Sequence, residues 1–478
     1  MGAGRIGSVS GPAPATVPQN RWRDIDVAPV SESPAAATVS VLLDGAPAEE
    51  RASSAALAAQ TYPAELVEVI GPGGEANPSG DIVILLAAGA VPEPEFVAAH
   101  ARWHHESADV VSFGPLAGED ADDDPLSWVV DLTRDFTDLG EGHHLAAAEG
   151  TVGMRRALYD EAGGAGKAAP DLWRLDLALR LHCAGAVFVA EPAALARGRA
   201  SGIARAVAAA SAAGRSLELE HPGAAALIPL PPWRAPASAR YHERPAMTVN
   251  LDAAGAPAEE SLATIAGVLG GRFGDLELRV QVPAGDPARD AIVAAVAADP
   301  RAALASTSLD EPCETPVQVT LPAAAALDPR TLADLHELAL DEDAGAFHVT
   351  VPGAAPQDTM ITVVMTAAWR RSRRLATASG DPVEAIMGEL FSERWMSGVE
   401  VSTRRHGVEE PQVTEHGPLA AATDLDHERK AHVRFRERSN DMAERARTLA
   451  RRTMAERLRA REQRRAAERV EERLGERA

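Results

Sequence analysis

The stretch TVSVLLDGAPAEERASSAALAAQTYPAELVEVIGPGG, residues 38–74, decides the fold. Thr38–Leu43 is a short, β-branched and apolar run of the kind that forms a buried strand, and Leu66–Ile70 is a second such run. Between them, Glu49–Gln60 is rich in alanine and contains neither glycine nor proline, which favours a helix. The order strand, helix, strand predicts one unit of a parallel α/β sheet.

The same alternation continues along the chain. Asp81–Leu86 and Asp109–Phe113 are apolar runs that predict further strands, and Glu95–Glu106 predicts the helix between them. The sequence therefore predicts an α/β domain built on a parallel sheet.

The opening pattern returns in TVNLDAAGAPAEESLATIAGVLGGRFGDLELRVQVPAG, residues 248–285. The hexapeptide GAPAEE occurs at 45–50 and again at 255–260. Later, an apolar run, a proline turn and a predicted helix ending in histidine occur in 83–100 and again in 317–336. Repetition at a spacing of about 210 residues predicts two copies of one α/β domain.

Composition divides the chain into six expected parts. Residues 427–478 lack proline and are dense in arginine, glutamate and alanine, which predicts a long charged helix. Arg21–Asp24, within the Gly/Pro-rich start, is a segment able to dock on the body. The parts are a flexible leader 1–37, a first domain 38–220, a Pro/Ala-rich linker 221–246, a second domain 247–375, a connecting segment 376–426 and the charged helix 427–478.

The net charge of −23 is unevenly spread, because residues 427–478 hold 17 basic and 10 acidic residues and the rest is strongly acidic. So acidic a body argues against nucleic acid as a partner. The start of the chain has no signal-like apolar region, and no apolar run approaches the ~20 residues that span a bilayer. We expect a cytoplasmic protein. The charged helix is expected to be solvated or a weak coiled-coil arm, or else to contact a membrane's inner face, a second copy or a protein partner.

Cysteine and histidine spacing offers no recognisable metal site. Cys183 and Cys313 have no accompanying zinc-ligand pattern and are expected to be buried thiols. His100, His104 and His105 share one predicted helix, and an i, i+4 pair can chelate zinc. Because no glutamate or cysteine completes a motif, a structural role is the favoured interpretation, with no metal assigned.

Six segments in order resemble the motifs of the family 2 glycosyltransferases of actinobacterial cell-surface glycan assembly. They are VSVLLDG (39–45), LAAQTYP (57–63), EVIGPGG (68–74), DIVILLAAGAVPEPEFVAAHARWHH (81–105), GTVGMRRALYDEAGG (150–164) and LDLALRLHCAGAVFVAEPAALARG (175–198). The resemblance covers about residues 36–200. It implies a GT-A fold and a nucleotide-sugar donor, and with the repeat it implies tandem GT-A-like domains, the second degenerate.

The reactive positions implied by the resemblance are mostly empty. The family's Asp-x-Asp motif, which binds Mg²⁺ or Mn²⁺, aligns with Ala87-Ala88-Gly89, and its nucleotide-binding Asp-Asp aligns with Gly71-Pro72. Its catalytic carboxylate aligns with Trp173-Arg174. Hydrocarbon and glycine side chains cannot coordinate a hard cation, and a guanidinium stays protonated near neutral pH. Mg²⁺ or Mn²⁺ is thus expected for the family, but the ligands are absent here.

Other groups remain as candidates. Asp171 and Asp176 flank the base position and are candidate catalytic residues, although Asp176 is equally well explained as a helix residue. Asp44 is either a donor contact or a turn residue, and Arg155 and Arg156 either balance a diphosphate without metal or lie on the surface. The positional donor-binding candidates are Asp44, Gly71, Ala87, Gly89, Arg155 and Arg156.

Three functions follow from these observations. The favoured one is a catalytically degenerate transferase that acts as a scaffold or regulatory partner in cell-surface glycan biosynthesis. The alternative is an active, atypical, metal-independent transferase. A third is a structural protein that assembles through residues 427–478.

Overall fold

The computed structural model describes most of the chain up to residue 405. The described residues are 15–17, 19–32, 36–45, 47–71, 77–117, 150–165, 173–198, 244–305, 313–341, 344–350, 360–397 and 403–405. The expected helix at 427–478 and most of the expected linker at 221–246 lie outside them.

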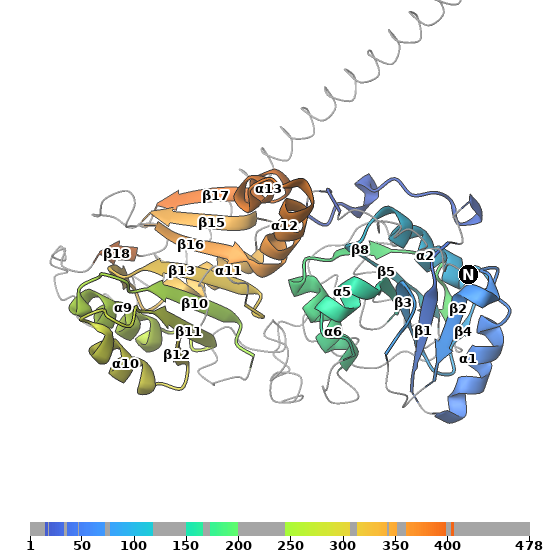
Figure 1. Cartoon of the computed structure of the whole chain (residues 1–478), viewed down its shortest axis with the longest axis horizontal. Helices are drawn as coiled ribbons and strands as arrows, with labels where there is room; N and C mark the ends of the chain where they lie inside the picture. Colours follow the sequence, from blue (N-terminus) through green and yellow to red (C-terminus); the bar gives the residue numbers. More distant parts are fainter. Residues whose placement is uncertain are drawn as a thin grey trace, which may run out of the picture. The chain divides into compact units, whose positions relative to one another are not determined.

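The first sheet has six strands in the order β2-β1-β3-β7-β5-β8 (Figure 1). All neighbours are parallel except β7, which runs antiparallel to both β3 and β5. The expected strands are confirmed, but the sheet is mixed rather than fully parallel, because apolar patterning does not encode strand direction. The bounds are β1 Val39–Asp44, β2 Val67–Ile70, β3 Ile82–Ala87, β5 Val110–Gly114, β7 Thr151–Arg155 and β8 Val187–Ala190.

Helices cover both faces of this sheet. Alternate residues of β1 point to opposite sides: Val41 packs with the helix residues Leu57 and Phe96, whereas Leu42 belongs to the core that contains Leu158 of the opposite face. Burial on both sides explains the continuous apolar run in β1. The helices are α1 Glu50–Leu57, α2 Phe96–Glu106, α5 Arg156–Glu161 and α6 Trp173–Cys183. Short 3-10 turns lie at Trp22–Asp24, Val30–Glu32, Pro47–Glu49 and Ala64–Leu66, and β4 Val91–Pro92, β6 Leu116–Ala117 and β9 Ala196–Arg197 form a small sheet.

The second sheet has seven strands in the order β12-β11-β10-β13-β16-β15-β17 (Figure 1). Its strands are β10 Met247–Asp252, β11 Leu276–Gln281, β12 Ala302–Leu304, β13 Val317–Pro322, β15 Ala344–Thr350, β16 Met360–Met365 and β17 Ser392–Ser397. Its helices are α9 Ala258–Gly270, α10 Arg289–Ala297, α11 Thr331–Asp341, α12 Thr366–Ser379 and α13 Val383–Leu390. Nearby, β14 Ala325–Leu327 pairs with β18 Thr403–Arg405.

The two sheets share one topology. Strands β11-β10-β13-β16-β15-β17 repeat both the order and the directions of β2-β1-β3-β7-β5-β8, with β16 as the antiparallel strand. The first parallel pairings correspond as well, Val39 with Val67 and Met247 with Leu276. The strand, helix, strand order expected in residues 38–74 and in residues 248–285 is confirmed, and β12 is an addition to the second sheet.

Two expected connecting regions contribute to the folded bodies. Residues 383–397, expected in a connecting segment, supply α13 and the edge strand β17 of the second sheet. Within the expected leader, Trp22 packs edge-on against Trp103, with ring centroids 6.0 Å apart. The Asn20 amide donates to the Phe188 carbonyl at 3.1 Å and accepts from the Phe188 N–H at 2.8 Å. Asn20 thus satisfies backbone groups of an edge strand, which protects that edge from other strands.

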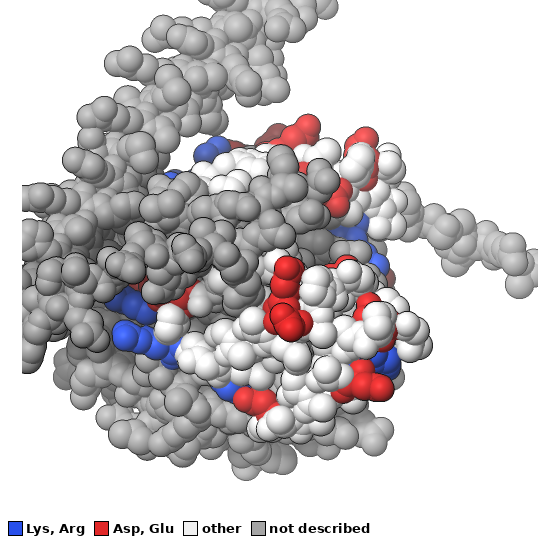
Figure 2. Space-filling view, turned by 90° about the vertical axis from the view of Figure 1, so that its left-hand side faces the viewer, with Lys and Arg blue, Asp and Glu red and all other residues white. Residues whose placement is uncertain are grey.

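The described surface carries charges of both signs. In the view of Figure 2, acidic side chains lie scattered among uncharged ones, and basic side chains gather in a few smaller places. Among the described residues, we find no helix with the length and hydrophobicity needed to cross a bilayer.

Candidate functional site

The ends of three parallel strands bring several of the candidate residues to one edge of the first sheet. Asp44 ends β1 and pairs in register with Ala87, which ends β3. Gly71 follows β2, whose last residue, Ile70, pairs with Leu42 of β1. The carboxyl ends of parallel strands are where ligands bind in open α/β sheets. The structure therefore places Asp44, Gly71 and Ala87 together at the carboxyl ends of the parallel strands, where such sheets commonly bind ligands.

An ion pair occupies this edge. The Arg174 Nε lies 3.1 Å from Asp44 Oδ2, and the two side chains are 13% and 36% exposed. Arg174 Nη1 also donates to the Gly150 carbonyl at 3.0 Å, and its guanidinium carbon lies 5.8 Å from the centre of the Trp173 ring. Arg174, which the sequence resemblance aligns with a catalytic base, is thus paired with the carboxylate of a donor-binding candidate.

The beginning of α1 adds negative charge beside the glycines of this edge. A Cβ placed on Gly71 would lie 2.8 Å from a Glu50 carboxylate oxygen, and one on Gly89 would lie 3.4 Å from the Glu49 Cβ. Gly89 has φ +87° and donates its N–H to Ser53 Oγ at 2.9 Å, so its loop is closed against α1. Glu49 and Glu50 were missed as site residues. The sequence signal at these positions is GAPAEE (45–50), which was interpreted only as part of the repeated pattern.

A divalent cation does not fit the Asp-x-Asp position. Ala87, Ala88 and Gly89 offer no side-chain oxygen, and hard cations need oxygen ligands. Among the described residues, no three histidine, cysteine, aspartate or glutamate side chains converge to hold a metal.

Asp176 is engaged elsewhere. It is buried, its Oδ2 accepts from Arg180 Nε at 2.9 Å, and its Oδ1 accepts from Arg244 Nη1 at 2.5 Å. Both oxygens of this catalytic candidate thus serve ion pairs, one within α6 and one that joins α6 to Arg244, shortly before β10. The other candidate, Asp171, lies outside the described residues.

Arg155 and Arg156 lie at the opposite edge of the sheet. Arg155 pairs in register with Ile82, at the start of β3, whereas Ala87 is at its end. Its Nε donates to the His104 carbonyl at 2.8 Å, and burial lowers the pKa of its guanidinium. Arg156 makes an exposed 4.0 Å pair with Asp160. The structure does not bring these two arginines to Asp44.

The histidines of α2 form a buried polar network. His100 Nδ1 lies 2.8 Å from Ser112 Oγ and its Nε2 lies 3.0 Å from Thr151 Oγ1, while His104 Nε2 lies 3.2 Å from the same serine oxygen. Burial lowers the pKa of His100 to about 3, so its ring is neutral. Their structural interpretation agrees with these contacts.

Both cysteines are free and buried, as expected from the sequence. Burial raises the pKa of the Cys183 thiol to about 12, so the reactive thiolate is disfavoured there.

At the corresponding edge of the second sheet, carboxylates accept hydrogen bonds from the backbone of the loops. Asp286 Oδ2 accepts from the Gly255 N–H at 2.9 Å and its Oδ1 accepts from the Ala288 N–H at 2.8 Å, joining the loops that follow β10 and β11. These hydrogen bonds lower the pKa of Asp286. Asp252, at the end of β10, accepts from the Ala254 N–H at 3.0 Å.

Comparison with known proteins finds distant similarities among solved structures, two of which are described below. No family model matches the chain, and no curated protein matches it. The solved structure of the mannosyltransferase PcManGT from Pyrobaculum calidifontis, in complex with GDP-Man and Mn²⁺, is 14% identical over 38% of this chain and 62% of that chain, with a TM-score of 0.27. The glycosyltransferase GlyE of Streptococcus pneumoniae TIGR4 is 11% identical over 32% of this chain and 45% of that chain, with a TM-score of 0.21. The chain thus spans less than two thirds of either structure, and the strand order and register, rather than these similarities, define its fold.

Proposed function

We propose that this chain is a glycosyltransferase-like protein of the family 2 type that has lost transfer chemistry. In this proposal it acts as a scaffold or regulatory partner in cell-surface glycan biosynthesis. The six ordered motifs of residues 39–198 support the family, and the pathway follows from that resemblance.

The observation that carries the proposal is the ion pair between Arg174 and Asp44. A guanidinium cannot accept the proton of an acceptor hydroxyl near neutral pH. A carboxylate that is already paired is also less available to a nucleotide. Two positions that the resemblance implies for transfer therefore pair with each other.

The surrounding charge supports the same conclusion. Glu49 and Glu50 lie beside the glycines of this edge, and the loop positions there offer no metal ligand to offset them. Carboxylates within a Debye length, about 8 Å at physiological salt, repel a diphosphate. Arg155 and Arg156, the cations proposed for a metal-free enzyme, lie at the far edge.

Calorimetry with UDP-, GDP- and TDP-sugars, with and without Mn²⁺, tests the loss of chemistry. We expect dissociation constants weaker than about 1 mM, which corresponds to about 4 kcal/mol of binding free energy. Asp44→Ala is the test variant, because Asp44 is partly exposed and lies at the end of β1. Asp160→Ala is the matched control, an exposed aspartate paired to an arginine at the opposite edge.

Tight binding that Asp44→Ala abolishes and Asp160→Ala preserves would refute the proposal. If that binding were indifferent to Mn²⁺, and nucleoside diphosphate were released on adding an acceptor, the metal-independent transferase would be the correct function.

Complementation tests the scaffold role separately. In a strain that lacks this protein, we expect a defect in cell-surface glycan, and we expect the Asp44→Ala, Arg174→Ala double variant to restore it as well as the natural chain does. A strain without any defect would contradict the scaffold role, and failure of the double variant alone would show that the edge is chemically needed.

A further inference from the structure

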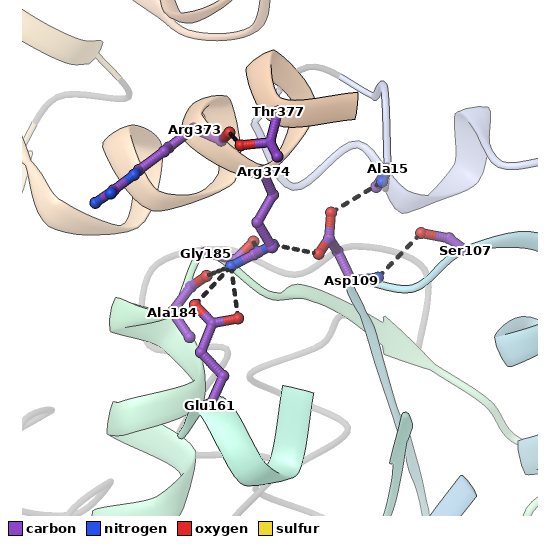
Figure 3. Close-up of polar contacts among 9 residues, drawn as sticks. All are labelled: Ala15, Ser107, Asp109, Glu161, Ala184, Gly185, Arg373, Arg374 and Thr377. Atoms are coloured by element: carbon purple, nitrogen blue, oxygen red, sulfur yellow. Dashed lines mark hydrogen bonds and ion pairs between the residues drawn. The ribbon is translucent and has the colours of Figure 1, made fainter. Parts of the chain in front are cut away.

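We name the part of the chain around the first sheet the first body and the part around the second sheet the second body. Helix α12 of the second body carries an arginine, Arg374, that contacts the first body. Arg374 Nε donates to Asp109 Oδ1 at 2.7 Å, and its Nη1 donates to Glu161 at 3.1 Å and to the Ala184 carbonyl at 2.6 Å (Figure 3). Asp109 is only 2% exposed, and it immediately precedes β5. A buried carboxylate of the first body is therefore paired by a guanidinium of the second.

The same carboxylate also binds the start of the chain. The second Asp109 oxygen accepts from the Ala15 N–H at 2.9 Å (Figure 3). Three separate parts of the sequence thus meet at one aspartate.

A second arginine of α12 depends on the start of the chain for its acceptors. Arg371 is 2% exposed, and it donates to the Val17 carbonyl at 3.0 Å and to the Gln19 carbonyl at 2.5 Å. Its guanidinium carbon also lies 4.5 Å from the centre of the Phe391 ring. Within the described residues, both hydrogen-bond acceptors of Arg371 belong to residues 15–22, which we name the clamp segment. Of this segment, residue 18 lies outside the described residues.

Other contacts hold the clamp segment to both bodies. Asn20 pairs with the backbone of Phe188 on the first sheet, and Trp22 packs against Trp103 of α2. On the other side, the Gln19 N–H donates to the Leu390 carbonyl at 3.0 Å, at the end of α13.

The two bodies also touch directly, where only a glycine fits. Gly185, between α6 and β8, has φ +79°, and a Cβ there would lie 2.4 Å from the Ala367 carbonyl oxygen of α12. The turn can lie this close to the helix because residue 185 has no side chain.

Because Arg371 is buried, the contact between the two bodies depends on the presence of the clamp segment. A guanidinium removed from water needs acceptors, and leaving a buried charge without them is strongly unfavourable. The Val17 and Gln19 carbonyls supply them only when the clamp segment is bound. Without it, Arg371 loses both carbonyl acceptors and keeps only the electrostatic attraction of nearby Asp109, so hydration of the guanidinium favours opening of the contact between the two sheets.

We propose that the clamp segment is an intramolecular clamp that joins the two sheet-containing bodies, and that Arg371 makes their association depend on it. The clamp does not involve sugar binding, so its test is independent of the function proposed above.

The test cuts the folded, full-length chain at two engineered protease sites, one at residues 33–35 and one within 221–240. Both lie outside the described residues. The first cut frees the start of the chain, and the second leaves the two bodies joined by non-covalent contacts alone. After the freed peptide is removed, the dissociation constant between the halves is measured with and without an excess of synthetic peptide 1–34.

Arg371→Met is compared with Arg373→Met on the same helix. Arg373 is exposed, lies 5.0 Å from the Trp369 ring, and points away from the cluster in Figure 3. We expect the peptide to tighten the halves at least about 30-fold in the natural chain and in Arg373→Met, since truncating one partner of a buried charged contact weakens binding by that order. In Arg371→Met we expect a tightening at least about fivefold smaller than in Arg373→Met, because the contacts of Asn20, Trp22 and the Gln19 N–H remain but no buried charge needs the peptide's carbonyls.

The proposal is overturned if the peptide leaves the natural halves unchanged, or tightens the Arg371→Met halves as much as the Arg373→Met halves. Should Arg371→Met fail to fold, the Asn20→Ala change is made in the peptide instead, where it cannot affect folding of the body. If the Asn20→Ala peptide tightens the halves at least about fivefold less than the unchanged peptide does, the clamp is supported. If it tightens them equally, Asn20 does not hold the clamp segment on β8 and the proposal is overturned.

Discussion

Acidification from pH 7 to pH 5 is expected to destabilise this protein through its buried histidines, among them His100 and His336. His100 is fully buried and His336 is 2% exposed. They lie in α2 and α11, which follow the corresponding strands β3 and β13 of the two sheets. Burial lowers the pKa of His100 to about 3 and that of His336 to about 4.

The direction of this change in stability follows from the number of protons that each state binds. In the unfolded chain a histidine titrates near its ordinary value of about 6.5. Between that value and the lowered pKa of the folded state, the unfolded chain binds a proton that the native protein does not. The free energy of unfolding therefore falls as the pH falls through this window. Between pH 7 and pH 5, each of these two histidines lowers the free energy of unfolding by about 2 kcal/mol, and together they lower it by about 4 kcal/mol. The free energy of unfolding of a typical domain is about 5–15 kcal/mol.

The assay is urea unfolding at pH 7 and pH 5, followed by circular dichroism and tryptophan fluorescence. His336→Met removes one titrating group, so the loss of stability between the two pH values should shrink by about 2 kcal/mol. The His336 ring packs on Phe273, with centroids 4.7 Å apart, so Phe273→Leu is the control that weakens the same contact but keeps the histidine. Its pH-dependent loss should equal that of the natural chain.

An unchanged pH-dependent loss in His336→Met would refute this reasoning. It would mean that acid destabilisation comes from other groups, or that His336 is already protonated in the folded protein at pH 5.

Three further predictions concern packing, charge and thiol reactivity. Gly185→Ala should lower the free energy of unfolding by about 2–4 kcal/mol, measured by urea titration, because its Cβ meets the Ala367 carbonyl at 2.4 Å; an unaffected midpoint would show that this contact is loose. Glu191→Ala should cost about 3–5 kcal/mol, since this carboxylate is 1% exposed and paired, whereas Glu93→Ala, at an exposed ion pair, should cost less than about 1 kcal/mol; equal effects in thermal melts would contradict the role of burial. Cys183 should resist iodoacetamide in the native protein and react after unfolding, as followed by mass spectrometry, and rapid native labelling would be inconsistent with a pKa of about 12.

Much of the architecture was predictable because it depends on local sequence patterns, such as apolar runs and alanine-rich stretches. The apolar run Thr38–Leu43 became β1, the alanine-rich stretch at 49–60 contains α1, and their recurrence after residue 247 produced a second sheet with the same strand order. The location of Asp44, Gly71 and Ala87 at one edge was also predictable, because each follows or ends a strand of a parallel set.

Other features depended on packing between distant parts of the chain. The sequence by itself determined the helices, the strands, the repeat and the absence of metal-binding side chains at positions 87–89, since these depend on residue type and short-range periodicity. Tertiary structure alone decided that β7 and β16 run antiparallel, that Arg174 pairs with Asp44, that Arg155 lies at the far edge, and that Arg371 is buried against the start of the chain. Each of these is a contact between segments far apart in sequence, and its partner is chosen by which charges and backbone groups remain unsatisfied once the sheets and helices have packed.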